Sequence, residues 1–359
     1  MRRRHLSLIA TATLSVAVVA CGSPSRRPQA SGTIVVRVDP EPGERHLANI
    51  RQLTFRGENA EAYWSADGRR LIFQSTRDGR TCDQQFIMDV EGGGLRRVST
   101  GTGKTTCGYF FDRDRRIFFS STHHADTACP PRPDFSRGYV WRLDPFEIYT
   151  ASSTGGELRR LTNWNAYTAE GTLSPDGSRI VFTSTKDGDL DIYTMRTDGS
   201  DVRRLTTTPG YDGGAFFSPD GSKIVYRAHH PADSASLANY RALLAQRLVR
   251  PSRMEIWVMD ADGTNQRQVT NLGGANFAPY FTPDGRRIIF ASNHTNPTGR
   301  EFDLYLVGLD GSGLERVTTH RDFDSFPMFS PDGKRLVWAS NRYAGQQGET
   351  NIFVADWRE

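Results

Sequence analysis

The chain has 359 residues, of which 37% are hydrophobic and 24% charged, a composition typical of a soluble globular protein. Its 34 glycines and 18 prolines indicate many tight turns and favour short strands over long helices. The formal net charge is +4, but three arginines that contribute to it, at positions 2 to 4, lie in a segment that we expect to be removed. The remaining chain is close to neutral, so net charge does not support a nucleic-acid partner.

The first 20 residues have the pattern of a targeting signal. Three arginines precede an apolar stretch from Leu6 to Val19, which is shorter than the ~20 residues that a membrane-spanning helix needs. Residues 18–22, Val-Val-Ala-Cys-Gly, resemble a bacterial lipobox, in which the cysteine is diacylated and becomes the mature N-terminus. We therefore expect a lipoprotein signal peptide at 1–20, lipidation of Cys21, and a flexible tether at 21–44. An ordinary secretory signal with a cysteine at its cleavage site is the alternative.

The residues after Cys21 indicate a location. Gly22 and Ser23 are not the acidic residues that retain lipoproteins in the inner membrane of Gram-negative cells. We therefore expect a protein of the cell envelope, held by its lipid anchor on the periplasmic side of the outer membrane.

One turn motif recurs through residues 45–359. It reads Ser-Pro-Asp-Gly or a near copy, in which proline fixes the first central position and glycine closes the hairpin. An apolar strand precedes each copy, two strands follow, and a second turn leads to a fourth strand. Four strands in about 45 residues is the period of a propeller blade. The copies begin at Ser65, Ser174, Ser218, Thr282 and Ser330, and a degenerate copy spans 112–115.

The ends of the chain predict how the ring closes. The sixth repeat stops after its third strand, which contains residues 352–355. Residues 49–54 match the fourth-strand pattern but precede the first repeat. We expect them to complete the last blade, which would remove two open sheet edges. The fold class is therefore all-β, a six-bladed propeller closed by an N-terminal strand.

These repeats resemble the TolB-like, PD-type WD-like repeat family over about residues 45–357. The resemblance implies a β-propeller, but the same repeat serves scaffolds, peptidase accessory domains and a few lyases. Resemblance to TolB-like proteins further implies that this propeller binds another envelope protein or a peptide. The sequence has no Gly-x-Ser-x-Gly nucleophile motif and no Walker or dinucleotide loop.

Repeats two and four are longer than the others because each has an insert between its second and third strands. Residues 129–144 are proline-rich and irregular, whereas residues 234–250 carry an apolar stripe and predict a helix in blade four. Both inserts should lie on one face of the ring. Cys82, Cys107 and Cys129 belong to blades one and two, and we expect one disulfide among them, with all three pairings open.

Two sets of polar residues recur at equivalent positions and form the predicted ligand site. The position just past each second strand is basic, and loops that lead into the first strands add acids. We expect both sets at the upper rim of the channel, where they could bind an anionic ligand or a carboxylate-bearing peptide. Alternatively, the two sets pair with each other and hold the blades together. The bases are Arg77, His123, Lys186, His230, His294 and Arg342, and the acids are Glu61, Glu170, Asp212 and Asp324. By contrast, the polar residue that opens each third strand, starting with Gln85, is interpreted as structural.

The histidines of this rim suggest a second function. His123, His230 and His294, with a carboxylate, could bind a divalent metal. Oligogalacturonate lyases, which resemble TolB propellers, use histidines from several blades in this way. The leading prediction is a lipid-anchored, protein- or peptide-binding propeller with no catalytic residues and no certain cofactor. The alternative is a metal-dependent lyase or hydrolase that acts on an acidic glycan.

Replacement of Cys21 by serine tests the lipid anchor. The Cys21→Ser protein should lose acylation and leave the membrane fraction, whereas a Ser23→Ala control should stay in it. Cell fractionation with a high-salt wash measures the outcome. A Cys21→Ser protein that still sediments with membranes would contradict the prediction.

Overall fold

The computed structural model describes residues 35–136 and 138–359. The predicted signal peptide, Cys21 and most of the predicted tether lie outside the described residues. Within them the chain is almost entirely β-structure, with one helix, α1 (Ser234–Leu244). No helix in these two ranges is long and apolar enough to cross a membrane.

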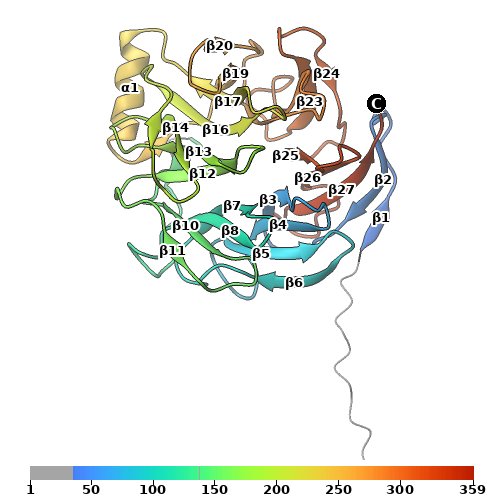
Figure 1. Cartoon of the computed structure of the whole chain (residues 1–359). Coiled ribbons are helices and arrows are strands. Elements are labelled where there is room, and N and C mark those ends of the chain that lie inside the picture. Colours follow the sequence, from blue (N-terminus) through green and yellow to red (C-terminus); the bar gives the residue numbers. More distant parts are fainter. Residues whose placement is uncertain (1–34, 137) are drawn as a thin grey trace, which may run out of the picture. The chain divides into compact units, whose positions relative to one another are not determined.

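Six antiparallel sheets are arranged around a common axis as the blades of a propeller, which confirms the predicted fold class (Figure 1). The innermost strands are β3 (Asn59–Trp64), β7 (Thr105–Phe111), β12 (Thr168–Leu173), β16 (Tyr211–Phe217), β21 (Asn276–Phe281) and β25 (Asp324–Phe329). Each inner strand contacts the inner strands of both neighbouring blades, so these strands form a closed inner wall.

The remaining strands follow in the predicted order from the axis outward. The second strands are β4 (Arg70–Ser75), β8 (Arg116–Ser121), β13 (Arg179–Ser184), β17 (Lys223–His229), β22 (Arg287–Ser292) and β26 (Arg335–Ser340). The third are β5 (Gln84–Asp89), β10 (Glu147–Ser152), β14 (Asp191–Arg196), β19 (Glu255–Asp260), β23 (Asp303–Gly308) and β27 (Asn351–Trp357). The fourth are β6 (Gly93–Arg97), β11 (Arg159–Arg160), β15 (Arg203–Arg204), β20 (Arg267–Gln268), β24 (Glu315–Arg316) and, in blade six, β2 (Leu47–Gln52).

The N-terminal strand closes the ring as predicted. β2 pairs antiparallel with β27, with Arg51 opposite Val354 and Gln52 opposite Phe353. The Leu53 N–H extends the pairing by donating to the Ile352 carbonyl at 2.8 Å. The sequence analysis did not foresee β1 (Val36–Val38), which pairs with the outer edge of β2 and lies in the predicted tether. The free backbone groups of β2 explain this addition, because an open strand edge favours a further partner.

The turn motif is held by its own side chains. In blade one, Ser65 Oγ donates to Asp67 Oδ1 at 2.6 Å and accepts from the Arg70 N–H at 2.9 Å. The degenerate copy of blade two has another function, because Asp114 accepts from the Ala66 and Asp67 N–H groups at 2.8 and 3.1 Å. Ala66 stands where four other copies have proline, which has no N–H to donate.

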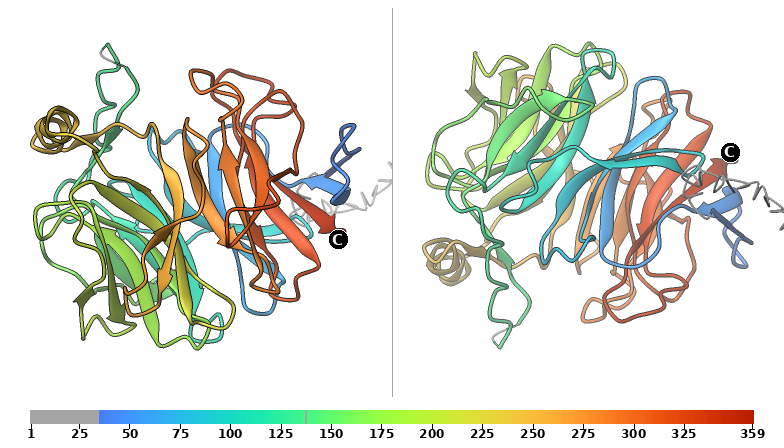
Figure 2. Two further views of the ribbon diagram at one scale, coloured as in Figure 1. Left: turned by 90° about the horizontal axis from the view of Figure 1, so that it is seen from above. Right: turned by 90° about the horizontal axis from the view of Figure 1, so that it is seen from below.

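The two inserts meet on one side of the ring (Figure 2). The predicted helix at 234–250 is shorter than expected, because α1 ends at Leu244 and the chain then forms β18 (Leu248–Val249). β18 pairs with β9 (Trp141–Arg142) of the other insert. Asp233 caps α1 by accepting from the Ser236 N–H at 2.7 Å. The predicted helix extended too far because the apolar residue Leu248 fits both a helical stripe and a buried strand.

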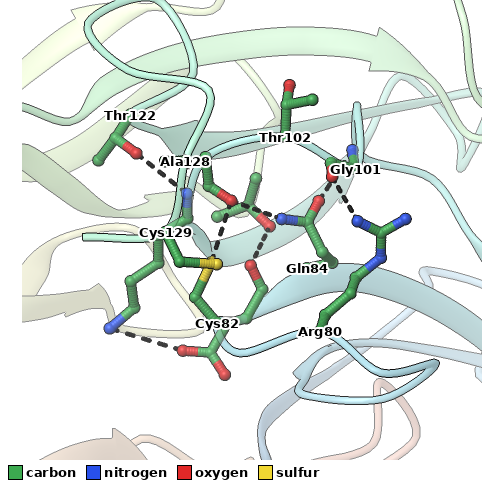
Figure 3. Close-up of a disulfide and its surroundings, with 12 residues drawn as sticks. Arg80, Cys82, Gln84, Gly101, Thr102, Thr122, Ala128 and Cys129 are labelled. Carbon is green, nitrogen blue, oxygen red and sulfur yellow. Dashed lines mark hydrogen bonds and ion pairs between the residues drawn. A yellow bond between two sulfur atoms is a disulfide. The ribbon is translucent and has the colours of Figure 1, made fainter. Parts of the chain in front are cut away.

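A disulfide attaches the insert of blade two to blade one. Cys82, which precedes β5, is bonded to Cys129 at the start of the insert (Figure 3). Cys107, on the inner strand β7, is a free and buried thiol. The structure thus selects one of the three pairings that the sequence left open.

Removal of the closing strand tests the architecture. A chain that begins after Thr54 should aggregate and melt earlier, because β27 would be left with an open edge. A chain that begins at Pro40 loses β1 but keeps β2, and it should remain monomeric. Light scattering coupled to size-exclusion chromatography, together with calorimetry, measures both variants. The closure is dispensable if the shorter chain stays monomeric with an unchanged melting temperature.

Candidate functional site

The six predicted rim bases share one contact. Each lies against the aromatic residue at the third position of the third strand in its own blade. Separations are measured between ring centroids for the histidines, and from the cationic atom to the ring centroid for the others. The pairs are Arg77–Phe86 (5.2 Å), His123–Tyr149 (4.4 Å), Lys186–Tyr193 (5.0 Å), His230–Trp257 (4.9 Å), His294–Tyr305 (4.6 Å) and Arg342–Phe353 (5.9 Å). A cation or imidazole over an aromatic face is stabilising, which explains why a basic residue recurs at this position.

The structure does not bring the three histidines together. His123 Nδ1 lies 2.7 Å from Ser121 Oγ, and His294 Nδ1 lies 3.0 Å from Ser292 Oγ, each within its own blade. Burial lowers the pKa of both histidines. Across residues 35–136 and 138–359, no three His, Cys, Asp or Glu side chains are placed to bind a metal ion. These histidines therefore do not fit the shared metal site that the alternative function requires.

Two of the predicted acids pair with predicted bases. His230 Nε2 lies 3.0 Å from Asp212 Oδ1, and Arg342 donates to Asp324 Oδ2 at 2.8 Å. Arg342 also donates to Glu44 Oε1 at 2.8 Å, and the side chains of Arg342, Glu44 and Asp324 are fully buried. This triad joins the segment before β2 to blade six and leaves Arg342 and Asp324 out of a ligand's reach. It matches the structural alternative, in which the rim groups hold parts of the ring together.

All four predicted acids lie on the inner strands and not in the loops that lead into them, and Glu61 and Glu170 occupy bulges of β3 and β12. Each inner strand has a β-bulge, and the bulged residues have positive φ angles. The bulged residues are Glu61, Cys107, Glu170, Gly214, Ala278 and Phe326. Those of neighbouring blades touch, because Cys107 Sγ donates to Glu61 Oε2 at 3.1 Å and the Gly214 N–H donates to Glu170 Oε2 at 2.9 Å. The bulges thus bring polar groups of blades one and two together, and those of blades three and four.

The sequence analysis missed Arg227, which organises the inner wall at blades three and four. Its guanidinium forms an ion pair with Glu170 and donates to Tyr211 Oη at 2.6 Å. Trp141 of β9 covers it, with its ring centroid 5.2 Å from the guanidinium carbon. The fifth position of the second strand is uncharged in the other blades. The charge of Arg227 at this position was therefore the sequence signal that could have identified it. The equivalent residues are Gln74, Ser120, Thr183, Ala291 and Ala339.

Glu61 has the most perturbed environment of the predicted acids. Burial, reinforced by the negative charge of Glu170, raises the Glu61 pKa to about 7, although the Cys107 thiol lowers it in part. Burial and the two carboxylates raise the pKa of Cys107 well above its usual range, so the thiol stays protonated and acts as a donor. The Gln74 Oε1 atom accepts from Thr106 Oγ1 at 2.6 Å and holds this bulge in place.

The predicted structural residue of blade one is displaced by one position. Gln84, rather than Gln85, occupies the first position of the third strand, and its Oε1 accepts from the Gly101 N–H at 2.9 Å and from Ser99 Oγ at 2.8 Å. Gln85 is fully buried, and neither of its amide atoms has a hydrogen-bond partner among the described residues. The pair of adjacent glutamines made the register ambiguous in the sequence.

The joined inserts form a platform on one face of the ring, made of residues 129–136, 138–144 and 231–254. Trp141 packs edge-on against Tyr211 and Phe277, and Tyr240 Oη of α1 donates to the Gly210 carbonyl at 2.6 Å. At the tip, Phe135 and Tyr139 are 46% and 60% exposed, with ring centroids 5.6 Å apart. Figure 2 shows this loop, in green, extending beyond the sheets beside α1.

Comparison with known proteins identifies the family. A family model described as PD40, the TolB beta propeller domain, matches residues 140–246 and 244–358, more than half of the chain. The chain belongs to the TolB β-propeller family. A Protein TolB homolog of Chlorobium luteolum (strain DSM 273 / BCRC 81028 / 2530) is 26% identical over 146 residues. This match covers 41% of the chain but only 28% of that relative.

Solved structures support the same fold for this TolB-family chain. A putative TolB from Agrobacterium tumefaciens has a TM-score of 0.55 and 21% identity, covering 84% of this chain and 91% of that one. TolB from Acinetobacter baumannii has a TM-score of 0.54 and 18% identity, covering 80% and 64%. An oligogalacturonate lyase from Vibrio parahaemolyticus has a TM-score of 0.52 and 12% identity, covering 91% and 98%. At these identities the likeness shows the fold alone.

The raised pKa of Glu61 predicts a pH-dependent stability. The folded-state pKa of about 7 exceeds the ordinary value of 4.5, so stability should fall as pH rises from about 4.5 through 7. Glu61→Gln should remove this loss and be more stable than the natural chain at pH 8, by up to about 3 kcal/mol. Denaturant unfolding at several pH values measures the difference, with the exposed Glu157→Gln as the control. A difference that does not change with pH would contradict the prediction.

Proposed function

We propose that this chain is a lipid-anchored propeller of the bacterial cell envelope that binds a protein or peptide on the insert platform. The pairing of β9 with β18 carries the proposal, because it joins inserts from two non-adjacent blades into one surface. That surface presents two stacked, exposed aromatic rings, Phe135 and Tyr139. Aromatic side chains of this kind contribute most of the binding energy in many protein interfaces.

The charge of the platform favours a partner with acidic groups. Residues 231–254 contain four arginines and a single acid, Asp233. The side chains of Arg241, Arg247 and Arg253 are exposed, and none has an ion-pair partner among the described residues. Arginine forms paired hydrogen bonds with carboxylates, so an acidic peptide or protein surface would suit this platform.

The predicted rim bases have a secondary place in this proposal. Connections between second and third strands emerge on the same face in every blade, so partly exposed bases surround the platform. Arg77, His123, Lys186, His230 and His294 could add peripheral contacts to an acidic partner. Arg342 is excluded because it is fully buried and paired.

The cellular location follows from the family and from the N-terminal sequence. Membership of the TolB propeller family supports a place in the envelope. The lipobox around Cys21 supports anchoring, and the following Gly22 and Ser23 support the periplasmic side of the outer membrane. Lipid anchoring would keep the platform close to the membrane and raise its effective concentration for envelope partners.

Loss of the two aromatic rings tests the platform. Full-length chain with Phe135→Ser and Tyr139→Ser should lose the envelope proteins that the natural chain captures by crosslinking in cells of the source bacterium. Its melting temperature should change little, because both side chains are exposed. The control is Leu314→Ser, an exposed apolar residue of the loop before β24, which should keep those partners. Capture of the same partners by the double variant would refute the platform as the binding surface.

A further inference from the structure

A hollow of about 860 Å³ opens at blade six and shares no lining residue with the insert platform. The rim base Arg342 is buried behind it, and the neighbouring Asn341 and Tyr343 line the hollow. It is lined by residues 319–322, which lead from β24 to β25, by residues 341 and 343–349 of the loop between β26 and β27, and by Glu41. Its volume lies within the range of about 300–1,000 Å³ that small-molecule sites occupy. The proposed protein-binding function does not use this hollow.

Tyr343 presents an exposed aromatic ring to the hollow, and its backbone conformation is energetically unfavourable. Tyr343 is 50% exposed. Its backbone has a φ of +59°, which is unfavourable for a bulky residue. Its ring meets the His320 ring edge-on, with centroids 5.6 Å apart. Strained residues of this kind cluster at ligand-binding sites, where the surrounding structure maintains the strain.

The loop that carries Tyr343 is fixed before any ligand binds. The buried Glu349 accepts from the Gly345 N–H at 3.0 Å and from the Arg56 N–H at 2.8 Å. Asn341 Oδ1 accepts from Thr350 Oγ1 at 2.7 Å at the other end of the loop. These bonds hold the loop between blades six and one, so little ordering would be needed on binding.

The polar groups of the hollow include both hydrogen-bond donors and acceptors that a ligand could reach. Among the described residues, the side chains of Gln346, Gln347 and Arg321 form no hydrogen bond or ion pair. Asp322 and Glu41 are 42% and 36% exposed, and their carboxylates lie 3.5 and 4.0 Å from His320. Amide and guanidinium donors therefore stand beside carboxylate and amide acceptors next to one aromatic face.

We infer that this hollow binds a neutral oligosaccharide. Each sugar hydroxyl both donates and accepts, which suits the mixture of amides, guanidinium and carboxylates. The apolar C–H face of a sugar ring can pack on the exposed face of Tyr343. An anionic ligand fits less well, because the carboxylates of Glu41 and Asp322 oppose Arg321, which is the hollow's one arginine and has no ion pair among the described residues. An apolar ligand would find the Tyr343 ring in a wall that is otherwise mostly polar.

Binding of neutral trisaccharides to the purified full chain tests the inference. Saturation-transfer NMR and calorimetry with maltotriose, cellotriose and triacetylchitotriose should detect binding of at least one. Tyr343→Phe keeps the ring and should retain that binding, whereas Tyr343→Gly should weaken it by about tenfold or more. Tyr343→Gly should also raise the melting temperature or leave it unchanged, because glycine adopts a positive φ without strain.

Two controls separate this site from others. Tyr139→Ala removes another exposed tyrosine ring, on the insert platform, and should leave trisaccharide binding unchanged. Trigalacturonate, the acidic counterpart, should bind more weakly than the neutral sugars. The inference fails if no neutral trisaccharide binds, if Tyr343→Gly binds normally, if Tyr343→Gly melts earlier, or if trigalacturonate binds as tightly.

Discussion

The whole ring depends on the pairing of β2 with β27. A propeller made of consecutive repeats would leave an open edge on its last blade, and unpaired backbone groups at such an edge favour association with other chains. Here the closing strand comes from the other end of the sequence, so the first and last parts of the domain are held in one sheet. The buried Arg342–Glu44–Asp324 triad adds a second bond between the same two regions. Closure is therefore supported by both backbone pairing and a buried ion-pair network.

Closure also determines the chemistry of the inner wall. Once the ring is shut, the bulges of the six inner strands face neighbours on both sides, and side chains far apart in sequence come into contact. Cys107 thereby meets Glu61, and Glu170 meets both Gly214 and Arg227. The polar groups belong to blades one to four, whereas blades five and six contribute Ala278 and Phe326 at the same positions. At the bulge positions the wall is thus polar in blades one to four and apolar in blades five and six.

The sequence predicted the features that repeat and missed those that occur once. The turn motif and the unmatched strand at residues 49–54 specified the blades and their closure, because both follow from local turn chemistry and from edge pairing. The contact of each rim base with an aromatic ring could not be predicted, since the partner lies on another strand and its ring could have faced either side. β18 was hidden in a helical pattern, and Arg227 was visible only as a departure from the repeat. The choice of Cys82 and Cys129 required distances that spacing alone does not provide.

The disulfide places the assembly of the insert platform in a particular compartment. It closes a loop of 47 residues, and in the chain-entropy description such a crosslink stabilises the folded state by about 4 kcal/mol. The crosslink forms only where thiols can be oxidised, so a chain still in the reducing cytosol lacks this attachment between the insert and blade one. Phe135 and Tyr139 lie a few residues beyond Cys129 and would be held less firmly there. In the proposed function, export would thus complete the binding surface, and a newly made chain would compete poorly for the partners of the mature protein.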